Sequence, residues 1–396
     1  MEKIRMIAAI LLVCGFVVFN LNSKIIVNKR DIVNFEIIEV VGIDIKKGEG
    51  ENVEISFVKN DTTSSSEETE DSESEEKVSS VIVSITGTSF NDALRKAQVV
   101  MNKYVTNWYV KYFIIGEETA KNNMIDAMDF VIRDIDTKFN AKIYISKGQT
   151  AKEFLNNIET NGDKISSKIQ NMEQSSNKIS NSYEMEITDF FKMISEEVPS
   201  GLIPTLENYD VTVGEKEIKD IGFGGFAIFN KDKITQILDL KSSRAANFIL
   251  NRAKFTNIDI LKSNGTLVSL GIIKIKPDIS FEFNENKLEK IKILFVVDSN
   301  IEEVYAKEDI YNEKTIKELE NMQSDIIKKE AEEVLRKAQK EKIDFLNIKN
   351  KLIIKHPYKW EHLKDSWEET FENAEIEMYV DSSIRRTYDV ISEINY

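Results

Sequence analysis

The N-terminal segment is the feature of this sequence that most constrains how the chain can fold. Residues 6–19 form an uninterrupted apolar run, with Lys3 and Arg5 before it and Lys24 after it. A short basic region followed by an apolar run is typical of an export signal. Extended to residues 6–21, with flanking cations that can reach the lipid headgroups, the run is long enough for a short membrane span. Since no later stretch approaches the roughly 20 apolar residues that a spanning helix needs, we expect one membrane anchor on a large water-exposed body.

Three fates are open for this segment, residues 1–23. It remains as an uncleaved anchor, it carries a lipid on Cys14, or it is removed on secretion. No small–x–small cleavage pattern is evident around residues 20–23, and Val13 is not the small residue that precedes a lipidated cysteine. A buried core helix is disfavoured because the run lies at the chain terminus and has no polar face. All three fates place residues 24–396 outside the cytoplasm.

The composition of the chain argues against several classes of function. Its 396 residues include 53 Lys and Arg against 68 Asp and Glu, a net charge of −15, which argues against broad nucleic-acid binding. One cysteine permits neither an internal disulfide nor a cysteine zinc cluster, and His356 and His362 are too few for a three-histidine metal site. We find no catalytic constellation, no metal-ligand set and no cofactor motif, and we expect a protein that is not an enzyme.

Two local patterns imitate functional sites. Residues 222–226, Gly-Phe-Gly-Gly-Phe, look like a phosphate loop, but they lack its Lys-Ser/Thr pair and lead into a strand instead of a helix. Glycines inside a strand indicate a bulge or a close backbone approach. His356 and His362 lie near Trp360 and Trp367 without the helical spacing of a metal pair, so we expect them to be exposed or packed on aromatic rings.

Alternating strand and helix patterns predict an α+β protein with helices packed on a sheet. In the N-terminal part, residues 24–199, we expect strands at 35–45, 51–58, 78–86, 108–115 and 142–146, and helices at 89–104, 117–132, 151–158 and 186–196. Residues 60–77 are nearly all Ser, Thr, Glu and Asp and predict a disordered acidic loop. The alternative for this loop is a tract that collects calcium or is phosphorylated.

Pro199, Gly201 and Pro204 indicate a boundary, after which a middle domain at residues 200–265 is expected. Its predicted strands lie at 209–213, 222–229 and 233–238, with a helix at 242–252. The C-terminal part, residues 266–396, predicts strands at 266–275, 279–283, 290–297 and 375–380. A long charged helix at about 312–341 carries one apolar stripe, and we expect it to lie across the C-terminal sheet.

Several short motifs occur here in the order in which they occur in the GerAC, or Ger(x)C, spore germination proteins. The chain resembles this family over most of residues 29–390. Each motif alone is weak, and their shared order and spacing carry the resemblance. The motifs are Lys29-Arg30-Asp31-Ile32, Val40-Val41-Gly42-Ile43-Asp44, Asp92-Ala93-Leu94-Arg95-Lys96, Ile114-Ile115-Gly116-Glu117-Glu118, Phe130-Val131-Ile132-Arg133-Asp134, Gly224-Gly225-Phe226-Ala227-Ile228-Phe229, and Asp344-Phe345-Leu346 with Trp360 and Trp367.

The resemblance implies three α+β domains behind the anchor, each a mixed or antiparallel sheet flanked by helices. It implies a non-enzymatic subunit of a nutrient germinant receptor, the C subunit, which works with membrane-embedded A and B subunits. It also implies a place on the outer face of the spore inner membrane, anchored by residues 6–21. Family members typically carry a lipidated cysteine at the position that falls near Ile26 here. Cys14 lies about a dozen residues earlier inside the apolar run, which favours a peptide anchor.

Two other functions stay open on the sequence. An anchored extracytoplasmic solute-binding protein needs an aromatic-lined pocket with a few convergent polar groups. A cell-wall hydrolase needs two carboxylates roughly 5–9.5 Å apart in a cleft. Phe113, Trp360 and Trp367 are conceivable anchors of a protein interface, but burial in the core is the expected role of each.

Overall fold

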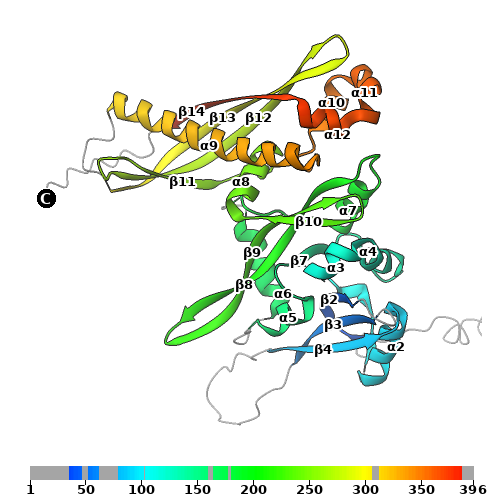
Figure 1. The fold of residues 1–396 in the computed structure, drawn as a ribbon. Coiled ribbons are helices and arrows are strands. Elements are labelled where there is room, and N and C mark those ends of the chain that lie inside the picture. The colour runs from blue at the N-terminus through cyan, green and yellow to red at the C-terminus, as the bar shows by residue number, and fades with distance from the viewer. Residues whose placement is uncertain are drawn as a thin grey trace, which may run out of the picture.

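The computed structural model describes residues 35–46, 52–61, 79–101, 103–158, 164–176, 180–305 and 312–385 (Figure 1). The predicted anchor at residues 1–23, with Cys14, lies outside these residues. So does the predicted acidic loop, except that residues 60 and 61 form the end of a strand. Within the described ranges, no helix combines the length and the apolar character that crossing a membrane requires.

The described residues form three sheets, and the largest has eight strands in the order β10-β9-β8-β7-β6-β2-β3-β4. Its central strands β2, β6, β7 and β8 pair in parallel, and antiparallel strands continue the sheet on both sides. The strands are β2 (Ile38–Lys46), β3 (Asn52–Asp61), β4 (Ser79–Gly87), β6 (Tyr112–Gly116), β7 (Lys142–Ser146), β8 (Ser200–Val213), β9 (Lys216–Asn230) and β10 (Lys233–Leu238).

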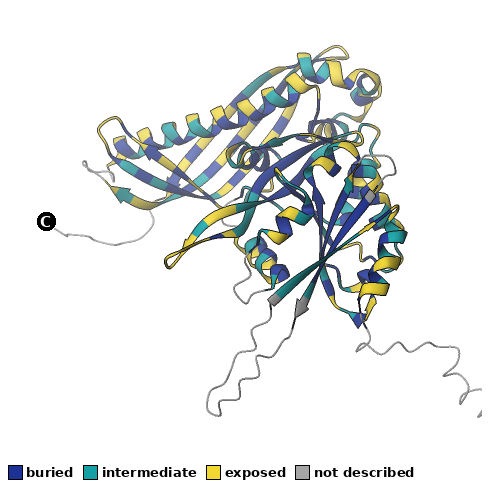
Figure 2. Cartoon of the chain, turned by 60° about the horizontal axis from the view of Figure 1, so that its bottom comes forward, coloured by how far each residue is buried: buried dark blue, intermediate teal, exposed yellow. Residues whose placement is uncertain are grey.

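Helices cover both faces of this sheet, so its central strands are apolar on both sides. Alternate residues of β6 show this: Phe113 and Ile115 pack under α2, α3, α4 and α7, whereas Tyr112 and Ile114 pack under α5 and α6. Figure 2 shows the resulting band of buried residues along the strands. The helices are α2 (Phe90–Val100), α3 (Glu117–Asn122), α4 (Met124–Arg133), α5 (Ala151–Asn156), α6 (Ile165–Ser176) and α7 (Ile187–Ile194).

The second sheet holds four strands in the order β11-β12-β13-β14, and one long helix lies across it (Figure 1). Asn312 caps this helix by accepting a hydrogen bond from the Thr315 N–H at 2.8 Å, and its buried stripe faces the sheet. The elements are α8 (Leu240–Ile249), β11 (Thr256–Leu261), β12 (Leu267–Asn284), β13 (Lys287–Tyr305), α9 (Glu313–Glu341), α10 (Ile348–Lys355), α11 (Pro357–Leu363), η4 (Lys364–Ser366), α12 (Trp367–Asn373) and β14 (Glu375–Arg385).

The third sheet is small and lies where the described chain begins. β1 (Phe35–Glu36) pairs in parallel with β5 (Tyr104–Val105), and the short 3-10 helix η3 (Asn107–Tyr109) follows β5. Trp108, predicted to begin a strand, lies in η3 instead. The Phe35 ring stacks on Trp108 with centroids 5.8 Å apart and meets Tyr104 edge-on at 5.5 Å. Aromatic packing therefore holds this short sheet against η3.

The middle part of the chain differs from its prediction. β8 runs through Pro204, which lies opposite Phe226, and it pairs with β7 at Ile145 and Thr205. Residues 200–238 therefore extend the N-terminal sheet and do not form a sheet of their own. β8 begins at Ser200, directly after Pro199, and continues through Pro204, because the φ angle of proline suits extended backbone and proline interrupts a strand only where its missing N–H is needed.

Two further elements differ from the sequence prediction for local reasons. The helix expected at 117–132 is divided by Asn123, whose φ of −142° and ψ of 29° end α3 and begin α4. The two strands expected around Pro277 are one strand, β12. Pro277 lies opposite Phe295 of β13 and beyond the part of β12 that pairs with β11, which ends at Ile272, so β12 has one strand neighbour at this position.

Candidate interaction surface

The residues that imitate catalytic or binding motifs in the sequence have structural roles. Gly224 is the extra residue of a bulge, and a side chain on Gly225, whose φ is +101°, would place its Cβ 2.2 Å from the Leu238 carbonyl oxygen. The expected close backbone approach is therefore confirmed. His356 meets the rings of Phe281 and Phe283 edge-on, as aromatic packing predicts. Among the described residues, no three His, Cys, Asp or Glu side chains come together as a metal site.

Three of the motif residues, Gly42, Asp44 and Gly116, form one structural unit. Asp44 on β2 accepts hydrogen bonds from the Ala151 and Lys152 N–H groups at 2.9 and 3.0 Å, which caps the first turn of α5. A Cβ on Gly116 would lie 2.1 Å from Asp44 Oδ1, and a Cβ on Gly42 would lie 2.9 Å from a methyl group of α5. The two glycines are required because they leave room for α5 and its carboxylate cap on the sheet.

The motif around Asp344 joins the two parts of the molecule. Buried Asp344 accepts hydrogen bonds from the Ile348 and Lys349 N–H groups at 2.9 and 2.7 Å, so it caps α10. The Lys349 ammonium group then reaches back to Glu196, 2.7 Å away after α7, and to the Val198 carbonyl oxygen. These contacts connect the C-terminal helices to the chain that leads into β8.

The aromatic residues considered as interface anchors are all buried. Trp360 and Trp367 are 7% and 2% exposed and meet edge-on at 5.6 Å, and Phe113 is fully buried in the larger sheet. The core role expected for these three residues is therefore confirmed, and an interaction surface has to be sought elsewhere.

A carboxylate on α6 is the centre of a buried polar cluster on the eight-stranded sheet. Glu173 accepts hydrogen bonds from the Tyr144 hydroxyl at 2.7 Å and the Tyr112 hydroxyl at 3.1 Å, and the Lys142 ammonium group lies 2.6 Å away. Burial, reinforced by the Glu173 charge, raises the pKa of both tyrosines. The tyrosines therefore stay protonated and donate, and the cluster fastens α6 to β6 and β7.

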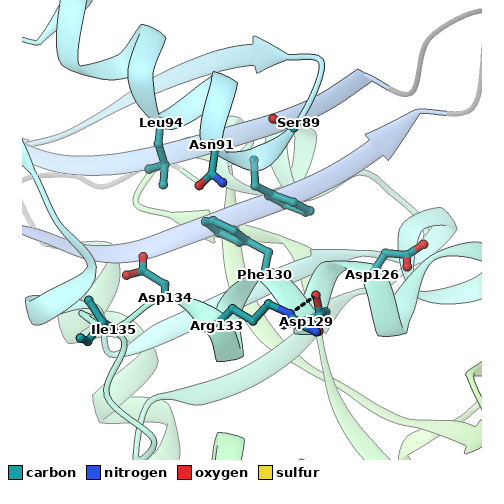
Figure 3. Close-up of a pocket in the computed structure, with 10 residues that line it drawn as sticks. Ser89, Asn91, Leu94, Asp126, Asp129, Phe130, Arg133, Asp134 and Ile135 are labelled. Carbon is teal, nitrogen blue, oxygen red and sulfur yellow. Dashed lines mark hydrogen bonds and ion pairs between the residues drawn. The ribbon is translucent and has the colours of Figure 1, made fainter.

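A groove of about 510 Å³ between α2 and α4 is one surface with the chemistry of a binding site (Figure 3). Its apolar floor contains Phe90 and Phe130, whose rings stack 4.2 Å apart and nearly parallel. Figure 3 shows Arg133 turned onto Asp129, which it binds through both carboxylate oxygens at 2.7 and 2.8 Å. The carboxylates of Asp126 and Asp134 make the rim of the groove acidic. An apolar floor with an acidic rim suits an apolar segment with basic flanks.

An exposed apolar surface lies next to this groove, at the small sheet. We define the β1 face as Ile37, Val99, Val100, Tyr104 and Trp108, all of which are exposed. The Gln98 side chain holds the last turn of α2 against β5 through two hydrogen bonds to Val105, which brings the exposed end of α2 beside the small sheet. Ile135, which is 96% exposed, lies between this face and the groove, because its neighbours Asp134 and Asp136 bind Asn107 and Thr106.

The sequence prediction did not single out the β1 face, although it carried one signal. The apolar stripe of α2 is formed by Phe90, Leu94, Ala97 and Met101, and Val99 and Val100 fall outside it. Two adjacent valines off the buried stripe of an amphipathic helix indicate exposed apolar side chains. Tyr104 and Trp108 carry no such signal, since only the tertiary structure decides which aromatic residues are exposed.

In comparisons with known proteins, both parts of the chain match families of spore germination proteins. The family described as "Spore germination protein N-terminal domain" matches residues 28–208, and "Spore germination B3/GerAC like, C-terminal" matches residues 224–388. Spore germination protein KC of Bacillus subtilis (strain 168) is 24% identical over 331 residues, which cover 77% of this chain and 78% of that protein. The crystal structure of the GerBC protein aligns with a TM-score of 0.52 and 16% identity over 87% of this chain and 97% of that chain, which shows a shared fold.

Proposed function

The chain belongs to the GerAC family of spore germination proteins, and from that membership we propose that it is the C subunit of a nutrient germinant receptor. In this proposal the N-terminal segment anchors the body on the outer face of the spore inner membrane, where it works with the A and B subunits without catalysing a reaction. The observation that carries the proposal is the ordered match of both family models, at residues 28–208 and 224–388.

The structure supports a binding role because its motif residues, and the buried carboxylate of Glu173, have structural explanations that need no substrate. Asp44 and Asp344 cap helices, Glu173 fastens α6 to the sheet, and Gly225 permits a close backbone approach. The groove between α2 and α4 remains as an accessible surface with a defined chemistry. We propose that it receives an apolar segment with basic flanks from a membrane-embedded subunit.

Germination of spores that lack this gene tests the receptor role. We expect loss of the response to nutrients, an intact response to a trigger that bypasses nutrient receptors, and recovery when the intact gene is returned. Failure of both responses would overturn the receptor role and favour an action on the cortex, as a hydrolase would have. Unchanged germination in a strain without sister receptors would also contradict the proposal.

A substitution in the groove tests its role in the same assay. Asn91 is exposed at the groove, and Asn91→Arg adds a cation and bulk where a basic partner segment would bind. We expect nutrient germination to slow about tenfold or more while the protein stays at its normal level in the membrane. Asn321→Arg, on the exposed side of α9, is the matched control and should germinate normally. Equal germination of the two variants would exclude the groove as a contact site.

A further inference from the structure

We propose that the β1 face inserts into the lipid–water interface beside the anchor, so that the body lies on the membrane in one orientation. This inference rests on the membrane anchoring included in the proposed function. The described chain begins at Phe35, in the small sheet that carries this face. The end of the body that is tied to the N-terminal segment is therefore also the end that exposes these apolar side chains.

The side chains of the β1 face have the chemistry of a membrane interface. Trp and Tyr are enriched at the level of the lipid headgroups, because each ring has an apolar body and one polar group. Trp108 is 48% exposed, with Tyr104 beside it, and Val99 is 84% exposed on the adjoining turn of α2. An apolar cluster of this kind is costly to leave in water and gains from contact with acyl chains.

The charges near the β1 face are compatible with an anionic lipid surface. Lys103 and Lys138 are exposed at its border. Three nearby carboxylates are engaged within the protein, whereas Glu36, next to Ile37, is half-buried and keeps an acidic charge at the face. Glu39 binds Lys111 at 2.5 Å, Asp134 accepts a hydrogen bond from Asn107, and Asp136 accepts one from Thr106. Exposed lysines beside interfacial aromatics favour binding to negatively charged headgroups.

The length of the connecting chain keeps this face close to the bilayer. Residues 22–34, which number 13, lie between the predicted anchor at 6–21 and Phe35. Fully extended, they reach about 45 Å at most. A tether this short gives the β1 face a high effective concentration at the membrane, so that a few shallowly inserted side chains suffice for docking.

The tryptophans offer a direct test, because Trp360 and Trp367 are buried in the C-terminal part and only Trp108 is substantially exposed. The full chain is reconstituted into phosphatidylcholine–phosphatidylglycerol vesicles whose acyl chains carry bromine near the headgroups. We expect brominated lipid to remove up to about a third of the tryptophan emission, the share of one of three tryptophans. We also expect poor quenching by aqueous iodide, and Trp108→Phe should abolish the lipid quenching.

Flotation of the same vesicles separates failure of docking from failure of anchoring. If the full chain does not float with the vesicles, the anchoring in the proposed function is wrong and the docking falls with it. If it floats but iodide quenches Trp108 and brominated lipid does not, the docking is wrong and the anchoring stands. Protection of Trp108 from both quenchers would mean that a protein surface covers the face, which also overturns the proposal.

A second pair of variants tests the face without altering the reporter. The double change Val99→Ser and Val100→Ser removes exposed apolar side chains, so it should reduce quenching by brominated lipid at least twofold without unfolding the chain. Ile354→Ser, at a residue that is 76% exposed on α10, is the matched control. Equal quenching in the double variant and the wild-type protein would contradict insertion of the α2 end of the face.

Discussion

Single buried carboxylates hold distant elements of this protein together. Glu173 lies on α6, and it binds side chains of β6 and β7, those of Tyr112, Tyr144 and Lys142. The tyrosine hydroxyl groups are part of this arrangement only while they keep their protons. Burial, together with the Glu173 charge, raises the pKa of Tyr144 well above its usual value. At alkaline pH the Tyr144 hydroxyl therefore keeps its proton in the folded protein and loses it in the unfolded chain.

Tyr144→Phe should therefore change how stability depends on pH. Above about pH 10 the tyrosine ionises in the unfolded chain only, so the free energy of unfolding falls by up to about 1.4 kcal/mol per pH unit for this group. The variant lacks this loss, and its stability should decline less steeply between pH 9 and 11. At pH 8 it should be about 1–2 kcal/mol less stable, because Glu173 loses a donor. Urea unfolding at several pH values measures both effects.

The control for this prediction is Tyr358→Phe, because Tyr358 is exposed on α11 and binds no buried carboxylate. Its stability at pH 8 should stay at the wild-type value. An equal or steeper alkaline decline in Tyr144→Phe than in the wild type would show that the buried hydroxyl does not govern the pH dependence.

At the element scale, Glu330 of α9 forms ion pairs with two cations of α8, Arg244 and, at 3.9 Å, Lys241. Arg244 on α8 binds both carboxylate oxygens of Glu330 at 2.7 and 2.8 Å and also donates to the Asn257 carbonyl oxygen in β11. Glu330 is buried in the stripe of α9 that faces the sheet, whereas Arg244 is partly exposed. The pair therefore sets the position of α9 on α8, where apolar contacts alone leave some freedom to slide.

Glu330→Ala should destabilise the protein by about 2–4 kcal/mol, because it leaves a cavity and a guanidinium group without its partner. The double variant Arg244→Met with Glu330→Met should recover at least half of that loss, since apolar side chains of similar length can replace a buried pair. Urea unfolding measures both. Glu332→Ala, at a partly exposed pair with Arg336 on the same helix, should change stability by less than about 0.5 kcal/mol. A double variant as unstable as the single one would contradict this account.

At the scale of the whole molecule, the two large sheets share one core. Leu202 and Phe226 of the eight-stranded sheet belong to the same apolar cluster as α8, α9 and the inner face of the four-stranded sheet. The Lys349 ammonium group, 5% exposed, adds a polar connection to Glu196 and the Val198 carbonyl oxygen. We therefore expect the two parts to unfold together.

Lys349→Met tests this coupling because it removes the ammonium group and keeps most of the side-chain volume. The change leaves the Val198 carbonyl oxygen and Glu196 without their donor, so the C-terminal part should unfold earlier, with a first transition lowered by about 3–6 °C. Calorimetry should show one transition for the wild type and a broadened or divided one for the variant. Lys351→Met, exposed on α10, is the control. One sharp transition at the wild-type temperature in Lys349→Met would exclude the coupling.

The accuracy of the sequence predictions depended on how local each signal is. β7 occupies residues 142–146 as predicted, and α9 begins and ends within one residue of the helix expected at 312–341, because a periodic stripe and an Asn cap lie within the element itself. The division of a helix at Asn123 and the continuity of β8 through Pro204 were not predicted, since backbone propensity is overridden by the pairing of neighbouring strands and helices.

The α+β class, the family and most element positions were predictable from the amino-acid sequence, because periodicity, caps and ordered motifs are properties of neighbouring residues. The roles of the motif residues follow from how the chain packs in three dimensions. Gly116 must be glycine because Asp44, 72 positions earlier, occupies the space of its side chain. The β1 face likewise brings the end of α2, β5 and η3 beside the start of the described chain. Contacts between residues so distant in the chain follow from how the elements pack, which no local pattern records.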